Sequence, residues 1–258
     1  AIATSKDEVE SLKYRSARAV MQMQFRQARD LMERYLKARP RDIEAWDEMA
    51  ALSAYVGDRR AMARAARRIY ELSAEAGEPR SRAITLLVQA GRYDEAADLA
   101  KRILQARPTA ATVLYQGHRA AVYAGRRDEA RDYLRRVMAS ALPDHVKDTA
   151  RLRQACADGR FSDARDAYQR LSQSGRMSAR FHAAQIVGDD KGAIQALASL
   201  DTPARVTTLM QFMTYPSFNA GAYPILRARL AADGLTPRPP VPVPHRCRPG
   251  VISAAAEA

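Results

Sequence analysis

Apolar and polar positions along most of the chain repeat with the period of an amphipathic helix. In residues 94–106 an apolar stripe with steps of three and four residues carries Ala96, Leu99, Ala100, Ile103 and Leu104. Residues 80–90 have apolar side chains at similar spacing, and Gly91 follows them. Side chains three and four positions apart share one face of a helix, and glycine readily ends a helix in the left-handed conformation. The pattern therefore predicts two helices that meet near Gly91.

The same hairpin pattern returns every 34 residues. The glycines of this register are Gly57, Gly91, Gly125 and Gly159. Small residues form a second column at Ala28, Ala96, Ala130 and Ala164, which Met62 interrupts. Apolar residues form a third column at Tyr35, Ile69, Ile103, Val137 and Leu171. Several independent columns with one period predict stacked helical hairpins, and the small column predicts that the two helices of each hairpin pack closely.

The residues around these columns resemble the tetratricopeptide repeat (TPR) family. The match rests on Gly91–Ala96 (GRYDEA) followed by Pro108, and on Ala45-Trp46 with Gly57-Asp58. The resemblance covers about residues 6–174 as five repeats, and a shorter sixth repeat follows. It implies an all-α fold, a right-handed α-α superhelix (TPR solenoid) of about six helical hairpins with C-terminal capping helices.

The expected domain organisation has three parts. The repeats occupy residues 1–200, as 6–40, 43–76, 77–110, 111–144, 145–174 and 175–200. Residues 201–235 form a capping segment, with helices expected over 203–213 and 223–232, which we expect to cover the last hairpin. Residues 236–258 form a Pro-rich tail, for which we expect a flexible or polyproline II conformation, with an SH3-type ligand as the alternative.

The capping segment carries a second resemblance. Pro216-Ser217-Phe218 and Gly234-Leu235 are similar to the C-terminal ending of bacterial TPR-containing transcriptional regulators and adenylate cyclases. The resemblance implies that the chain is the regulatory or docking part of a larger bacterial regulator. The DNA-binding and cyclase activities of those proteins belong to other domains and are not carried over to these residues.

Basic residues exceed acidic ones, with 42 Lys+Arg against 29 Asp+Glu and a net charge of +13 in 258 residues. Some recur at one phase of the second helices, namely Arg34, Arg67, Arg68, Lys101, Arg102, Arg135, Arg136 and Arg170. A line of cations on an outer face fits a nucleic-acid-associated regulatory protein. Basic residues near helix C-termini also complement the helix dipole, and an arginine-rich composition is common in GC-rich genomes. Nucleic-acid binding is therefore the alternative function.

The residues that could act in catalysis or bind a metal do not form the patterns that most enzymes and metal sites require. The four histidines have no i,i+4 pairing, and Cys156 and Cys247 form neither a metal quartet nor a disulfide framework. We expect no catalytic residues, no metal and no cofactor, and a packed, hydrogen-bonded His118. No apolar run approaches the ~18 residues of a membrane span. The cysteine content fits a reducing compartment, so we expect a cytoplasmic protein, or a periplasmic one if an N-terminal signal was removed.

The TPR resemblance also implies a binding surface. In that family the first helices of the repeats line a concave groove that holds a partner peptide or helix. The corresponding residues here are Lys13, Asp47, Thr85, Tyr115, Arg119, Tyr123, Arg153 and His182. Four of them, Tyr115, Arg119, Tyr123 and Arg153, resemble an anchor cluster, because Tyr and Arg dominate binding hot spots. The alternative is that these side chains are simply solvated.

One TPR subclass does not fit the groove residues. The carboxylate-clamp type needs Asn at two groove positions, but Asn219 is the one Asn of the chain and Ala17 occupies a clamp position. The sequence thus predicts a protein-protein interaction scaffold with a protein or peptide partner. It predicts no oligomeric state.

Overall fold

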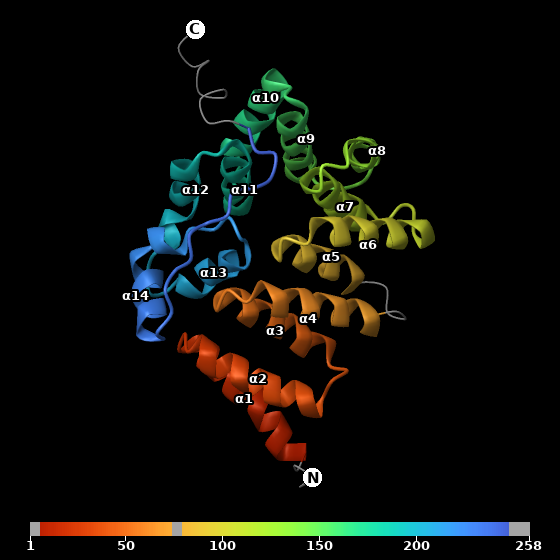
Figure 1. The fold of residues 1–258 in the computed structure, drawn as a ribbon. Helices are drawn as coiled ribbons and strands as arrows, with labels where there is room; N and C mark the ends of the chain where they lie inside the picture. Colours follow the sequence, from red (N-terminus) through yellow and green to blue (C-terminus); the bar gives the residue numbers. More distant parts are fainter. Residues whose placement is uncertain (1–5, 74–78, 248–258) are drawn as a thin grey trace. The chain divides into compact units, whose positions relative to one another are not determined.

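The computed structural model describes residues 6–73 and 79–247, and all regular elements in these ranges are helices. The chain forms an all-α solenoid of consecutive helical hairpins (Figure 1). It divides into two compact units. Unit 1 comprises Ala1–Gly91 and Asp201–Pro239, and unit 2 comprises Arg92–Leu200 and Pro240–Ala258.

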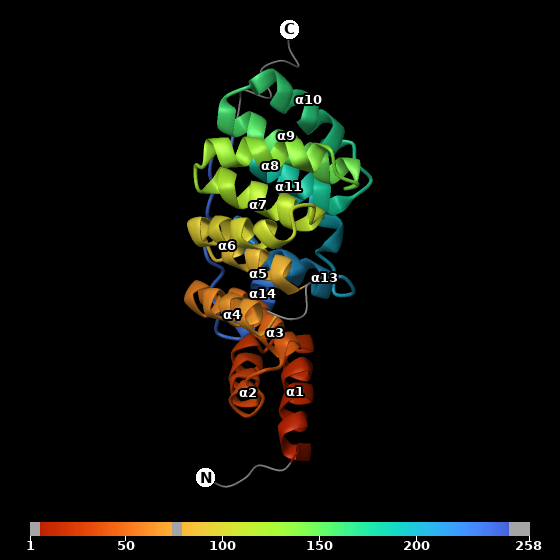
Figure 2. The same cartoon turned by 90° about the vertical axis from the view of Figure 1, so that its right-hand side faces the viewer.

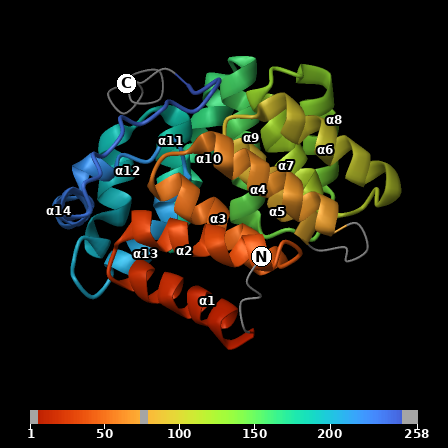
Figure 3. The same ribbon diagram turned by 60° about the horizontal axis from the view of Figure 1, so that its bottom comes forward.

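The N-terminal part of unit 1 contains the first two hairpins and the first helix of the third repeat. Its helices are α1 (Lys6–Met21), α2 (Phe25–Ala38), α3 (Ile43–Tyr55), α4 (Arg59–Leu72) and α5 (Pro79–Gln89). Each helix packs against the next one in the chain, as Figure 3 shows for α1 to α4. Met32 and Leu52 are buried in the apolar core between them. At the small column Ala28 is fully buried, and its carbonyl accepts a hydrogen bond from the Ser16 hydroxyl at 2.9 Å.

The C-terminal segment of unit 1 is less regular than the sequence predicts. It contains α13 (Val206–Met210), the 3-10 turns η2 (Gln211–Thr214) and η3 (Ala220–Ala222), and α14 (Pro224–Ala232). The helix expected over 203–213 is thus a short α-helix followed by a 3-10 turn, whereas the expected last helix is present. Within unit 1 the segment contacts α3, and Gln89 Nε2 donates to Thr214 Oγ1 at 3.1 Å. The sequence predicts this segment as a cap on the last hairpin, and it does not predict the contacts with α3 and Gln89.

Unit 2 contains three complete hairpins and the second helix of the third repeat. Its elements are α6 (Tyr93–Ala106), α7 (Ala111–Tyr123), α8 (Arg127–Met138), α9 (Asp144–Asp158), α10 (Phe161–Ser172), α11 (Met177–Val187), α12 (Asp190–Leu197) and η1 (Ala198–Leu200). Figure 2 shows α7 to α10 as stacked hairpins. Helix α7 contacts α9, and α9 contacts α11, so the first helices of successive repeats form one continuous layer.

Close approach of the helices in unit 2 explains the small column. Ala96 and Ala164 are fully buried, and Ala130 is nearly so. At Gly117 on α7, an added Cβ would lie 3.0 Å from the Cβ of Ala100 on α6. At the hairpin turn, Gly159 has φ +72° and ends α9 in the left-handed conformation, as the glycine register predicts.

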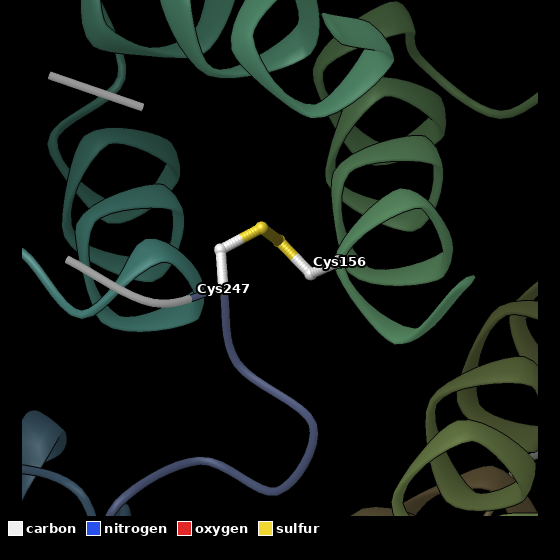
Figure 4. The surroundings of a disulfide bond; sticks show 2 residues. All are labelled: Cys156 and Cys247. Carbon is white, nitrogen blue, oxygen red and sulfur yellow. A yellow bond between two sulfur atoms is a disulfide. The ribbon is translucent and has the colours of Figure 1, made fainter. Parts of the chain in front are cut away.

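The Pro-rich tail differs from the prediction as far as the structure describes it. Cys247 is buried at 1% exposure and forms a disulfide with Cys156 of α9, 91 residues earlier (Figure 4). The Cys247 N–H donates to the Ile186 carbonyl at 3.0 Å. The prediction that the two cysteines form no disulfide is therefore wrong, and residue 247 is not part of a flexible tail. The remaining predicted tail, 248–258, lies outside the described residues.

Candidate interaction surface

The layer of first helices in unit 2 presents a row of large polar side chains on α7. Tyr115, Arg119 and Tyr123 are spaced four residues apart, so they share one face of this helix. Tyr115 and Arg119 are half-buried, and Tyr123 is 9% exposed. The Arg119 guanidinium lies 5.7 Å from the Tyr123 ring centroid, and the Tyr93 ring meets the edge of Tyr123 at 5.4 Å. These aromatic and cationic contacts hold the row in place.

The neighbouring helix α9 contributes Arg153, which completes the predicted anchor cluster. Its guanidinium carbon lies 5.7 Å from the Tyr115 ring and 5.5 Å from the Tyr123 ring. The side chain is 4% exposed, because α9 is packed between α7 and α11. The structure therefore brings Tyr115, Arg119, Tyr123 and Arg153 together, as the repeat register predicts. We call these four residues and His182 the arginine–tyrosine cluster.

His182 extends the cluster from α11, and its charge state reports the local potential. Burial, together with the positive charges of Arg119 and Arg153, lowers the pKa of His182 to about 3. His118, fully buried on α7, also has a pKa near 3, because of burial and the charge of Arg153. Its Nε2 lies 3.2 Å from Gln154 Oε1, so the expected packed, hydrogen-bonded histidine is confirmed. Both histidines are neutral near pH 7.

The pKa of the tyrosine at the centre of the cluster is lowered as well. Burial raises the pKa of the Tyr123 hydroxyl, but the charges of Arg153 and Arg119 and their hydrogen bonds to the hydroxyl outweigh burial, so the pKa is lowered. The positive charge of Arg153 contributes to the lowered pKa of Tyr123 and, beside the larger effect of burial, to the lowered pKa values of both histidines. The cluster has a positive potential that favours negative charge.

The predicted groove residues of unit 1 lie in a different environment. Lys13 Nζ contacts Asp42 at 3.3 Å and Glu44 at 3.7 Å. Asp42 is the N-cap of α3 and accepts from the Ala45 N–H at 2.9 Å, so this ion pair joins α1 to the start of α3. The guanidinium of Arg82 on α5 donates to both carboxylate oxygens of Asp47 on α3.

Thr85 is the third predicted groove residue of unit 1. It is half-buried on α5, and its hydroxyl donates to the Ser81 carbonyl at 3.2 Å. Lys13, Asp47 and Thr85 are thus engaged in contacts within or between neighbouring helices. Their role in partner binding stays a prediction, and the arginine–tyrosine cluster is the better candidate site.

Several members of the basic stripe on the second helices form ion pairs. Arg135 and Arg136 contact Asp132 at 2.7 and 3.2 Å, and Arg68 contacts Glu71 at 2.9 Å. Arg170 contacts Asp148 at 3.0 Å. Such pairs reduce the positive field that a phosphate backbone would meet at the stripe.

Two further properties of the described residues concern metal binding and membrane insertion. Within residues 6–73 and 79–247, no group of three or more His, Cys, Asp or Glu side chains could hold a metal ion. None of the described helices is both long and apolar enough to cross a bilayer.

Comparisons with known proteins show a likeness in fold. No family model matches the chain, and no curated protein matches it. Among solved structures the fold is similar to that of PilW, described as a widely conserved type IV pilus biogenesis factor. The likeness has a TM-score of 0.50 and 16% sequence identity, and it covers 77% of this chain and 94% of that chain. It supports a TPR-type helical repeat fold.

Proposed function

We propose that this chain is a protein-interaction scaffold that holds a segment of a protein partner on the α7–α9–α11 layer of unit 2. The helical-repeat fold supports a scaffold in general. The observation that carries the location is the convergence of two tyrosines and two arginines from adjacent helices. Tyr and Arg provide most of the binding energy at protein interfaces, because they combine large contact area with directed hydrogen bonds.

Affinity capture from the source cells tests this proposal. The wild-type chain is compared with Tyr115→Ala and Arg119→Ala, which alter two half-buried members of the cluster. Phe161→Ala is the matched control, because Phe161 is an exposed aromatic residue on the second helix α10. We expect Phe161→Ala to retain the partner and both cluster variants to lose it. Equal recovery with all four proteins would contradict the proposed site.

Nucleic-acid binding through the basic stripe remains the alternative function. The ion pairs of Arg68, Arg135, Arg136 and Arg170 make it the weaker candidate. Titration of labelled DNA and RNA at two salt concentrations separates the two functions. Phosphate-driven binding would be detectable near 50 mM salt and would weaken steeply as salt rises.

We also propose that the chain works in an oxidising compartment, the periplasmic alternative rather than the cytoplasm. The Cys156–Cys247 disulfide supports this proposal, because disulfides persist mainly outside the reducing cytoplasm. Alkylation of free thiols in intact cells, followed by non-reducing electrophoresis, tests it. Full alkylation of both cysteines without prior reduction would speak against an oxidising compartment.

A role as the regulatory part of a larger bacterial regulator is a further proposal. It rests on the resemblance of Pro216-Ser217-Phe218 and Gly234-Leu235 to the ends of such proteins. In unit 1, Phe218 is buried and stacks on Tyr223 at 5.2 Å, and Gly234 has φ +68° after α14. The genomic reading frame around this sequence tests the proposal by showing whether an effector domain is encoded in the same chain.

A further inference from the structure

Arg153 is a buried cation with unused hydrogen-bond donors. It is 4% exposed, and within the described part of the chain its Nε and Nη1 atoms have no hydrogen-bond partner. Gln185, one turn after His182 on α11, is 8% exposed, and its Nε2 is likewise unsatisfied in this part of the chain. Buried donors without acceptors cost free energy, and a buried charge costs more than a neutral group.

The helices around Arg153 supply no carboxylate for it. Neither α7 nor α11 contains an Asp or Glu residue. On α9, Asp148 pairs with Arg151 at 2.9 Å and with Arg170 at 3.0 Å. Asp158 pairs with Arg131 at 3.2 Å and with Arg160 at 3.6 Å. The acids of α9 near the cluster are therefore engaged with other arginines.

We propose that Arg153, supported by Arg119, binds a carboxylate group of the partner segment at the arginine–tyrosine cluster. This inference rests on the proposed function and specifies the chemistry that the same site recognises. A carboxylate would satisfy the unused donors of Arg153 and neutralise its charge. Charge-assisted hydrogen bonds of this kind are roughly twice as strong as neutral ones.

The cost of desolvation favours a carboxylate over a phosphate. The guanidinium of Arg153 lies 5.7 and 5.5 Å from the two tyrosine ring centroids, and its side chain is 4% exposed. A dianionic phosphate would lose more hydration on entering a site that is nine-tenths buried. A carboxylate on a flexible side chain, or at a chain terminus, can reach such a site at lower cost.

This site differs from the carboxylate-clamp arrangement that the sequence excludes. The cation here is an arginine held between tyrosine rings, without asparagine. Recognition depends on the desolvated Arg153, whereas the half-buried Arg119 is placed to meet the partner first. We therefore expect one acidic position of the partner segment to dominate its affinity.

A peptide experiment tests the proposal without knowledge of the partner. Random nine-residue peptides are selected on the intact, disulfide-bonded chain, and the tightest binder is synthesised with an amidated C-terminus. Each acidic residue is then changed to its amide, Glu→Gln or Asp→Asn, and to phosphoserine. A further version keeps the acid but carries a free C-terminus, and dissociation constants are measured by fluorescence anisotropy.

The receptor variants are Arg153→Met and a matched control, Arg151→Met. Arg151 lies on the same helix but is exposed and pairs with Asp148. We expect one acid-to-amide change to weaken binding to the wild type by about 10-fold or more. The same change should have little effect on Arg153→Met, while Arg151→Met behaves like the wild type. A dominant effect of the free C-terminus also supports the proposal and assigns the carboxylate to the chain end.

Three results would overturn the carboxylate proposal. The first is equal affinity for acidic and amide peptides, and the second is tightest binding of the phosphoserine version. The third is an acid preference that persists in Arg153→Met. If neutral peptides bind and Tyr115→Ala abolishes their binding, the proposed function stands while the carboxylate inference fails. If no peptide is selected, both fail.

Discussion

At the scale of single residues, a contribution to the stability of the fold does not explain why Arg153 is buried. A buried arginine without a carboxylate partner among the described residues destabilises the fold, even though two tyrosine rings offset part of the cost. Sites that bind ligands often retain such unfavourable groups, because the ligand completes their interactions. A bound ligand would therefore supply the hydrogen-bond acceptors and the negative charge that the fold does not provide for Arg153.

Replacing Arg153 with methionine tests this reasoning. The variant Arg153→Met keeps apolar contact with the tyrosine rings and removes the buried charge. We expect its free energy of unfolding to equal that of the wild type or to exceed it by about 1 kcal/mol. Urea denaturation at pH 7 measures this. The control is Arg170→Met, in which the buried Asp148 loses one arginine partner and keeps Arg151, at an expected cost of about 1 kcal/mol. A loss of several kcal/mol in Arg153→Met would assign it a structural role instead.

The buried histidines predict how stability depends on pH. The pKa values of His118 and His182 are about 3 in the folded chain, below the ordinary value of 6.5 in an unfolded one. Between these values the unfolded state binds more protons, so stability is complete above pH 6.5 and falls as the pH decreases towards 3. Each histidine contributes a slope of up to about 1.4 kcal/mol per pH unit.

The variant His182→Gln should reduce that slope. Denaturation measured from pH 4.5 to 6.5 isolates the histidines, because most carboxyl groups titrate below this window. An unchanged slope in His182→Gln would show that His182 is protonated in the folded chain. The positive potential assigned to the cluster would then be too large.

At the scale of helices, local sequence patterns predict most elements. They do not predict features that depend on contacts between residues far apart in the chain. Helix α6 occupies Tyr93–Ala106, close to the range 94–106 that its apolar stripe predicts, since such a stripe is a local signal. The helix expected over 203–213 stops being α-helical at Gln211, because packing on α3 fixes that turn and leaves no mark in the local pattern. The disulfide was missed for the same reason, as 91 residues separate its cysteines.

Two glycines of unit 2 allow the effect of backbone conformation on stability to be measured apart from the effect of packing. At both Gly159 and Gly175 an added Cβ would meet no atom within 4 Å, but Gly159 alone of the two has a positive φ, +72°. We expect Gly159→Ala to lower the free energy of unfolding by about 1–2 kcal/mol, because L-residues are strained in the left-handed region. Gly175→Ala should change it by less than about 0.5 kcal/mol. Equal effects in thermal or urea unfolding would contradict the role assigned to the glycine register.

The disulfide should contribute strongly to the stability of unit 2. Loop-closure entropy for a separation of 91 residues gives at most about 4.6 kcal/mol, and measured effects are commonly about 2–4 kcal/mol. We expect Cys247→Ser to lose roughly this amount in urea denaturation without reductant. The double variant Cys156→Ser/Cys247→Ser should match the reduced wild type. Identical midpoints for oxidised and reduced wild type would mean that the bond adds no stability.

At the scale of the whole molecule, the 34-residue register predicts both the solenoid and the convergence of its binding residues. Tyr115, Arg119 and Arg153 could be grouped from the sequence because repeat position specifies which helix face they share. Burial and pairing could not be predicted in this way, since they depend on which neighbours lie across the layer. The register places Lys13, Asp47 and Tyr115 at equivalent positions. Lys13 and Asp47 nevertheless form ion pairs, whereas the ring of Tyr115 lies against Arg153.

The net charge of +13 adds a long-range component to this local picture. A strongly basic chain attracts acidic partners and accelerates their association, more so at low ionic strength. Long-range attraction provides no specificity by itself, whereas the desolvated Arg153 can discriminate an acid from its amide. The two effects together favour a partner segment with acidic residues.

Site-specific photo-crosslinking tests the central claim most directly. A photoreactive phenylalanine analogue replaces Tyr115 in one protein and the exposed Phe161 in the other, and both are irradiated in the source cells. We expect a discrete adduct from position 115 that is lost when Arg119→Ala is added, and no adduct from position 161. No adduct at position 115, or the same adducts from both positions, would contradict a binding surface on the α7–α9–α11 layer.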